Sequence, residues 1–294
     1  MDLIEQLAGA LAARVAAAAP LVVAIRGGRR QCSGILWRPD VVVTSGQMLG
    51  DQANFVVAGQ DQQVEATLVG RDPGTNVAVL RLASSLAAAP LPSVGACAVG
   101  SLALIVGATS TGSPTARLAM IHALGDAWHS LAGGRIDALI RLDSRLGVDE
   151  GGPVLASDGG LLGMSTSGPR RRTIVIPTAT LDRVVDPLLN DGQIARGWLG
   201  VGLQPVMIPE ALRPLAGVEA GLMVVSLAPG APAETAGVLP GDILLDIDGT
   251  AVARPRALAG MLGPDRIGQP VALRMLRAGA LQTLSATVTA RPAG

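Results

Sequence analysis

Short runs of aliphatic and β-branched residues recur along roughly the first 180 residues, separated by Gly, Pro, Asp and Asn. Closely spaced runs of this kind are typical of an all-β barrel or sandwich. An Ala-rich helix is expected before them over 3–19, with Leu3, Leu7, Leu11 and Val15 on one face. The strands are expected at 22–25, 35–37, 41–44, 54–57, 66–69, 78–82, 102–106, 138–142, 160–164 and 174–176.

The pattern changes after a helix expected over 180–189. Two short helices, over 231–236 and 256–262, then lie among further strands. This arrangement predicts a compact α+β unit of about the minimum size for an independent domain. Its strands are expected at 198–204, 221–227, 242–247, 271–277 and 281–289. We therefore expect a mainly β domain over 1–190, a linker over 191–196 and a small α+β domain over 197–292.

Length and charge narrow the possible functions. A chain of 294 residues fits two domains, and its 23 basic and 23 acidic residues leave no net charge. Nothing in this balance indicates a nucleic-acid or anionic-membrane partner. The two cysteines, Cys32 and Cys97, lack metal-ligand spacing, and His122 and His129 have no paired ligands nearby in the sequence. No metal or cofactor is expected; the cysteines are expected to be two buried free thiols, with a disulfide between them left open.

The first residues are acidic, and Arg14 and Pro20 interrupt the apolar stretch. A secretory signal needs a basic start followed by an apolar run, so none is expected here. No run reaches the length of a membrane span. As it stands, the sequence therefore predicts a soluble cytoplasmic protein; a chain whose signal has been removed would instead be periplasmic or extracytoplasmic.

Three segments of the first domain carry a family resemblance. The segment 148–153, Val-Asp-Glu-Gly-Gly-Pro, resembles the nucleophile loop of HtrA/DegP serine proteases, Gly-Asn-Ser-Gly-Gly-Pro, with Glu150 in place of the serine. The segment 41–49 resembles the family strand that ends before the catalytic histidine, and Gln47 stands at that position. The segment 69–80 resembles the stretch carrying the catalytic aspartate, which Asn76 replaces. The resemblance implies a trypsin/chymotrypsin-like double β-barrel followed by a PDZ domain.

The replaced residues argue against serine-protease chemistry. A serine becomes nucleophilic when a histidine takes its proton and a carboxylate orients that histidine. Gln47 cannot act as a base and Asn76 carries no charge, while Glu150 brings a negative charge to the place where an oxyanion would form. Val148 replaces the family's oxyanion-loop glycine, so this loop is expected to be collapsed or reshaped. We predict a catalytically degenerate member.

The second domain resembles the PDZ family in three ordered motifs, at 197–203, 229–238 and 240–249. PDZ domains add a peptide as a strand beside a sheet edge and hold its terminal carboxylate with backbone amides. The resemblance implies that the peptide-binding residues are Trp198, Leu199, Gly200, Val201, Gly202, Leu203, Leu258 and Leu262. For Trp198, a place in the core at the domain boundary is an equal alternative to a role as peptide anchor.

The combination predicts an HtrA-like pseudoprotease that binds peptide or protein C-termini and serves as adaptor, scaffold or regulatory subunit in protein quality control. A catalytically active HtrA protease is a further candidate partner. Two alternatives remain open. One is a serine endopeptidase with noncanonical residues, for which Ser144, Ser157, Ser165 and Ser167 lie near the loop without a matching histidine. The other is a structural subunit of a mixed HtrA oligomer; family trimers rely on N-terminal aromatic residues, which this chain lacks.

Overall fold

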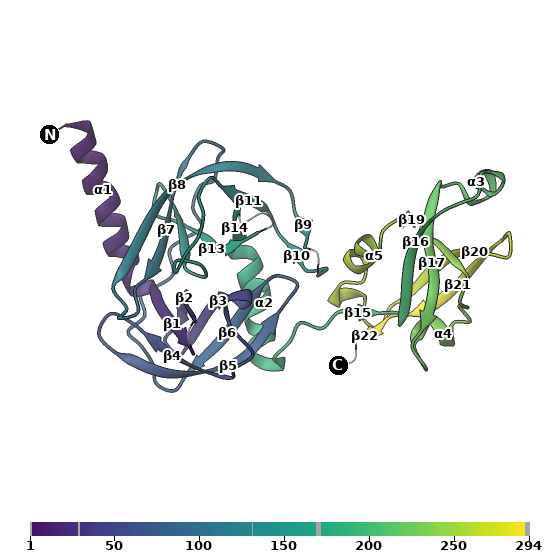
Figure 1. Cartoon of the computed structure of the whole chain (residues 1–294), viewed down its shortest axis with the longest axis horizontal. Coiled ribbons are helices and arrows are strands. Elements are labelled where there is room, and N and C mark those ends of the chain that lie inside the picture. Colours follow the sequence, from purple (N-terminus) through teal and green to yellow (C-terminus); the bar gives the residue numbers. More distant parts are fainter. Residues whose placement is uncertain (1, 29, 131, 169–171, 292–294) are drawn as a thin grey trace. The chain divides into compact units, whose positions relative to one another are not determined.

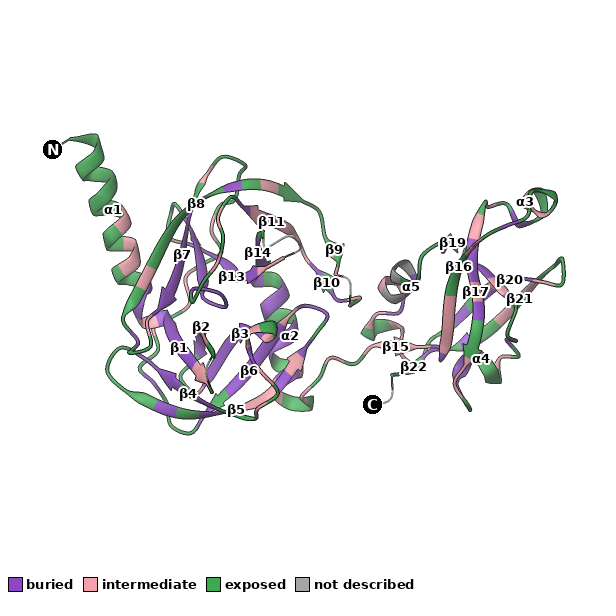
Figure 2. Ribbon diagram, in the orientation of Figure 1, coloured by how far each residue is buried: buried purple, intermediate pink, exposed green. Residues whose placement is uncertain are grey.

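The computed structural model describes residues 2–28, 30–130, 132–168 and 172–291. The chain divides into two compact units, Met1–Ile194 and Ala195–Gly294, and each is considered by itself. No described helix combines the length and the apolar composition needed to cross a bilayer. The first unit begins with α1 (Leu3–Ala18), which is exposed along most of its length (Figures 1 and 2).

Two closed barrels of six antiparallel strands form the body of the first unit. The first barrel has the order β1-β2-β3-β6-β5-β4. Its strands are β1 (Val22–Gly27), β2 (Arg30–Arg38), β3 (Val41–Ser45), β4 (Asn54–Ala58), β5 (Gln63–Asp72) and β6 (Val77–Leu82). The second has the order β11-β14-β13-β12-β7-β8. Its strands are β7 (Leu102–Ala108), β8 (Pro114–Gly125), β11 (Leu139–Leu142), β12 (Pro153–Ala156), β13 (Leu161–Ser167) and β14 (Thr173–Pro177).

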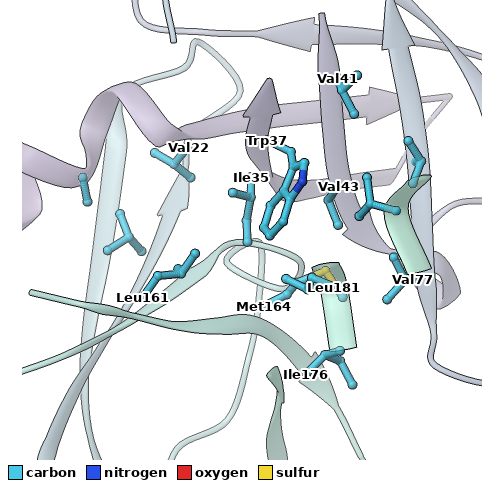
Figure 3. Packing of buried hydrophobic residues seen from close by; sticks show 14 of the residues in the cluster. Val22, Ile35, Trp37, Val41, Val43, Val77, Leu161, Met164, Ile176 and Leu181 are labelled. Atoms are coloured by element: carbon cyan, nitrogen blue, oxygen red, sulfur yellow. The ribbon is translucent and has the colours of Figure 1, made fainter. Parts of the chain in front are cut away.

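A hydrophobic cluster joins the two barrels. Ile35 and Trp37 of β2 share it with Leu161 and Met164 of β13 (Figure 3). The helix α2 (Thr178–Asp191) adds its buried face, and Gly192 ends the helix in the left-handed conformation, with φ of +71°. Since packed aliphatic side chains fix the barrels against each other, the loops that cross the seam are held in place. A short two-stranded sheet of β9 (Trp128–His129) and β10 (Arg135–Ile136) completes the unit.

The second unit has a sheet in the order β16-β17-β18-β20-β21, with β19 paired to β18. The main strands are β16 (Val201–Met207), β17 (Ala220–Leu227), β18 (Ile243–Ile247), β20 (Pro270–Arg277) and β21 (Ala280–Thr287). The short strands are β15 (Gly197–Trp198), β19 (Thr250–Ala251) and β22 (Thr289–Ala290), and the helices are α3 (Arg213–Ala216), α4 (Pro232–Thr235) and α5 (Pro255–Met261). The expected fold class, a double β-barrel followed by a small α+β domain, is confirmed.

The structure departs from the predicted elements in several places, and the following are the most informative. The strand expected over 198–204 is broken at Gly200, whose φ of +74° takes the chain out of the extended conformation. The strands β8 and β12 were not predicted. In β8 most residues are exposed or half-buried, and β12 has only four residues and begins at a proline, so neither gives a clear apolar signal.

The two cysteines are free thiols and form no disulfide. Cys32 is buried as expected, but the expected burial of Cys97 is wrong, because its side chain is exposed. Burial and, to a lesser extent, the charge of Glu150 raise the pKa of Cys32 to about 11, although a hydrogen bond between Cys32 and Thr44 acts the other way. Because the thiolate is the reactive form, we expect a disulfide reagent to modify one thiol, Cys97, in native protein at pH 8 and two after unfolding. Equal reaction rates for the two thiols would contradict this account.

Candidate functional site

The structure brings Gln47, Asn76 and Glu150 together at the seam between the barrels. Gln47 lies in the turn that follows β3, and Asn76 lies directly before β6. Asn76 has φ of +60°, a conformation that asparagine tolerates better than most residues. The turn before it is held by Asp72, whose carboxylate accepts hydrogen bonds from the amides of Gly74 and Thr75. Glu150 comes from the second barrel, shortly before β12.

The Glu150 carboxylate is buried and accepts hydrogen bonds through both oxygens. Oε1 accepts from Nε2 of Gln47 at 2.5 Å, from Oγ of Ser45 at 3.1 Å and from the amide of Ser167 at 3.1 Å. Oε2 accepts from Oγ of Ser167 at 2.6 Å. Among the described residues no cation lies within ion-pair distance of this carboxylate, so neutral donors alone stabilise its charge.

Asn76 and Gln47 complete the polar cluster. The side-chain oxygen of Asn76 accepts from the amide of Gln47 at 2.8 Å, and its Nδ2 donates to Ser45 at 3.0 Å and to Thr166 at 2.7 Å. Gln47 Nε2 also donates to the carbonyl of Ser167 at 3.0 Å. Ser45 and Thr166 were not identified from the sequence. The sequence offered a hint, since Ser45 is two residues before Gln47 and Thr166 is two residues after the strand predicted at 160–164.

The loop before β12 is held by hydrogen bonds between its own residues. The amide of Glu150 donates to the carbonyl of Gly147 at 3.2 Å, so it is not directed at a substrate. Asp149 is buried, pairs with Arg117 at 3.1 Å and accepts the amide of Gly147 at 2.8 Å. Val148 is exposed and is not among the non-glycine residues with positive φ, so the loop avoids backbone strain there. An oxyanion hole needs free amides at this turn, and the Glu150 amide is engaged.

Two of the candidate serines of the first unit, Ser165 and Ser167, are engaged in hydrogen bonds within the same cluster. Ser165 Oγ donates to the carbonyl of Asp149, and Ser167 Oγ to Glu150. His122 is exposed in β8, and His129 lies in β9 opposite Arg135; neither donates to or accepts from a described serine side chain. Within the ranges given above, no group of three or more His, Cys, Asp or Glu side chains is placed to hold a metal ion.

In the second unit, the segment Trp198–Val201 forms a tight loop between β15 and β16. The carbonyls of Leu199 and Gly200 accept hydrogen bonds from the amides of Ala233 at 3.0 Å and Ala228 at 2.8 Å. A Cβ added at Gly200 would lie 2.1 Å from the Cβ of Ala231, so only glycine fits at this position. These contacts fix the backbone of the loop, which is the feature that a carboxylate cradle requires.

The strand β16 is the last strand of its sheet, and α5 lies close to it (Figure 1). Leu258 and Leu262 are buried in the core of this unit together with Leu199. Val201 and Leu203 of β16 are half-buried against the same core, and Gly202 lies between them in the strand. The free edge of β16 is therefore bordered by aliphatic side chains. The roles of these residues in peptide binding stay predictions.

Trp198 lies apart from the other predicted peptide-binding side chains. It is half-buried and lines a pocket of about 340 Å³ that also involves Pro232, Thr235 and Ala236 near α4 and Ser285 and Thr287 of β21. A Cβ added at Gly200 would lie 3.1 Å from the indole ring of Trp198, so this ring packs against the loop backbone. The geometry fits a supporting role in the loop better than a role as exposed anchor.

Comparisons with known proteins agree with this architecture. Residues 32–164 match the family model of the trypsin-like peptidase domain, and residues 197–288 match that of the PDZ domain. A probable periplasmic serine endoprotease DegP-like of Brucella suis is 29% identical over 274 residues, which cover 89% of this chain and 53% of that protein. The corresponding protein of Rhizobium meliloti is 29% identical over 276 residues, covering 90% and 54%. The chain thus spans about half the length of these curated relatives.

Solved structures cover both units. The HtrA-type protease AlgW with decapeptide has 25% identity and a TM-score of 0.75, over 96% of this chain and 99% of that one. The serine endoprotease from Yersinia pestis, at 24% identity and a TM-score of 0.73, covers 95% and 97% and shows the same fold. With a trypsin-like peptidase domain followed by a PDZ domain, this chain belongs to the HtrA/DegP family.

Proposed function

We propose that this protein is an HtrA-like pseudoprotease that binds the C-termini of peptides or proteins through its PDZ domain and acts as an adaptor or regulatory subunit in protein quality control. The observation that carries the proposal is the buried carboxylate of Glu150, which accepts hydrogen bonds from Gln47, Ser45 and Ser167 at the place expected for the nucleophile. A carboxylate there repels the oxyanion of acyl transfer, and Gln47 cannot accept the proton that a serine would have to lose.

The PDZ part of the proposal is supported by an unpaired edge at β16, by aliphatic side chains beside it and by a loop whose backbone is held in place. One structural relative is described as an HtrA-type protease with decapeptide, which supports peptide recognition by this architecture. The curated relatives are named as periplasmic proteins, so we also propose the periplasm as the compartment. Fractionation of cells that express the native gene would test that assignment.

The competing function is that of a serine endopeptidase, which the names of the relatives favour. We expect purified protein to show no hydrolysis of unfolded casein above the buffer rate. The variant Glu150→Ser should stay inactive as well, because Gln47 and Asn76 supply neither base nor charge. Hydrolysis by the unmodified protein that is lost in Glu150→Ala would overturn the pseudoprotease proposal.

Peptide recognition is tested separately by a fluorescence-polarisation titration of the whole chain with a library of C-terminal peptides. We expect binding to members with apolar C-termini, and loss of binding when the same peptide is amidated, because the loop amides read the terminal carboxylate. Binding that survives amidation would contradict this mode. Absence of binding to any member would favour the structural-subunit alternative.

A further inference from the structure

The edge strand β16 of the PDZ domain contains a proline, whose position bears on how many residues of a peptide can form backbone hydrogen bonds with the strand. This inference rests on the proposed peptide-binding function of the PDZ domain. The strand β16 is paired on one side with β17, and on the other side it has no strand partner within the described part of the chain. Pro205 lies in the middle of this strand. Because proline has no N–H, it is tolerated at an edge only where its nitrogen faces away from the neighbouring strand.

Two backbone hydrogen bonds establish which residues of β16 face β17. At one end of the strand the amide of Ile208 donates to the carbonyl of Glu219 at 2.9 Å. At the other end the carbonyl of Gly200 accepts from the amide of Ala228 at 2.8 Å. In an antiparallel ladder the backbone groups of successive residues alternate between the partner and the opposite side. The even-numbered residues thus bond to β17, and Leu203 and Pro205 direct their backbone groups to the free edge.

The register shift in this pair does not disturb the alternation along β16. Gly202 is paired with Ser226 and Leu203 with Val224, so the extra residue, Val225, belongs to β17. The strand β16 itself advances by one residue at each step. The free edge therefore offers both a donor and an acceptor at Leu203, and an acceptor alone at Pro205.

A peptide added here runs antiparallel to β16, with its carboxylate at the loop amides of residues 199–201. Two residues along β16 correspond to two residues back along the peptide. The third residue from the peptide C-terminus then lies beside Leu203 and can make both backbone hydrogen bonds. The fifth lies beside Pro205, where its carbonyl finds the ring Cδ instead of an N–H.

We propose that Pro205 is the point beyond which a bound peptide forms no further complete set of backbone hydrogen bonds with β16. The groove then recognises the last three or four residues of a C-terminus, and the residues before them add little to the affinity. The partner is accordingly a protein with an accessible short C-terminal tail. An extended strand laid along the whole edge is disfavoured. Prolines at edge strands also hinder pairing between copies of a protein, and the test below separates that role from peptide reading.

The experiment compares two fluorescent peptides that share the C-terminal tetrapeptide of the tightest library member, one of four residues and one extended to eight with alternating Ser and Ala. With the unmodified whole chain, we expect their dissociation constants to agree within about twofold. In Pro205→Ala the restored N–H should tighten the octapeptide by about three- to tenfold, the effect of one net hydrogen bond, and leave the tetrapeptide unchanged.

The control is Gln204→Ala, a neighbouring residue whose backbone faces β17, which should change neither the affinities nor their ratio. An octapeptide that binds the unmodified protein more than tenfold tighter than the tetrapeptide would overturn the limit on reading length but keep the peptide-binding function. An unchanged ratio in Pro205→Ala, with or without new self-association, would also overturn it. Failure of both peptides to bind would reject the proposed PDZ function itself.

Discussion

Replacing Asp242 with asparagine is expected to destabilise the PDZ domain by about 3 kcal/mol. The Asp242 side chain is 2% exposed and accepts two hydrogen bonds from Arg277, at 2.7 and 2.6 Å, and one from the amide of Leu239 at 2.8 Å. Asparagine loses the charge and turns an NH₂ group toward these donors. Urea unfolding followed by hydrogen exchange in β18 and β20 measures the loss for this domain alone.

The matched control is Asp248→Asn in the same domain. Asp248 also pairs with an arginine, Arg266, but its side chain is 40% exposed, so the same change should cost less than about 1 kcal/mol.

Burial alone would raise the pKa of Asp242, yet the hydrogen bonds from Arg277 and Leu239 outweigh it and lower that pKa. Its stabilisation is therefore present above the unfolded pKa of about 3.9 and lost as the pH falls through the folded value. Asp242→Asn should remove this acid dependence; equal losses in both variants would contradict the account.

The variant Glu150→Ala is expected to destabilise the peptidase-like domain by about 3 kcal/mol. The substitution leaves the amide of Ser167 without its acceptor and removes the strongest contact of Gln47. It also removes a connection between the barrels, because Glu150 comes from the second barrel and Ser45 and Gln47 from the first. Unfolding by urea, followed through the buried Trp37, measures the change.

A matched control for this second variant is Glu65→Ala. Glu65 is an exposed glutamate of β5 in the same domain, so its removal should change the unfolding free energy by about 0.5 kcal/mol or less. If Glu150→Ala were as mild as the control, or stabilising, the carboxylate would be a residue kept at the cost of stability, as catalytic groups often are. That result would favour a catalytic activity at the seam between the two barrels.

The position of the polar cluster agrees with the proposed loss of catalysis. Catalytic residues of a two-barrel protease have to come from both barrels, so they lie where the barrels meet. Once Gln47, Asn76 and Glu150 stand at these positions, the same proximity lets them form hydrogen bonds across the seam. A charge in this place is tolerated because Ser45 and Ser167 donate to it.

Local chemistry made much of the fold predictable. Ten strands of the first domain and the helix before the linker followed from apolar runs punctuated by Gly, Pro and Asp. The misses had local causes as well. Gly200 interrupts an otherwise apolar run because its left-handed conformation turns the chain. In β8 the only apolar run, at 118–121, is four residues long and most of the strand faces solvent.

The sequence by itself determined the two-part β-rich architecture and the PDZ motifs, because residue type and spacing are local properties. It also predicted that Gln47, Asn76 and Glu150 replace the three catalytic residues. Tertiary structure decided what those positions do now. Only the meeting of the two barrels brings Ser45 to Glu150, and the pairing of β12 with β13 brings Thr166 and Ser167 to it. Strand pairing also shows that Pro205 faces the free edge. Such contacts join residues as many as 105 positions apart, and no local pattern specifies them.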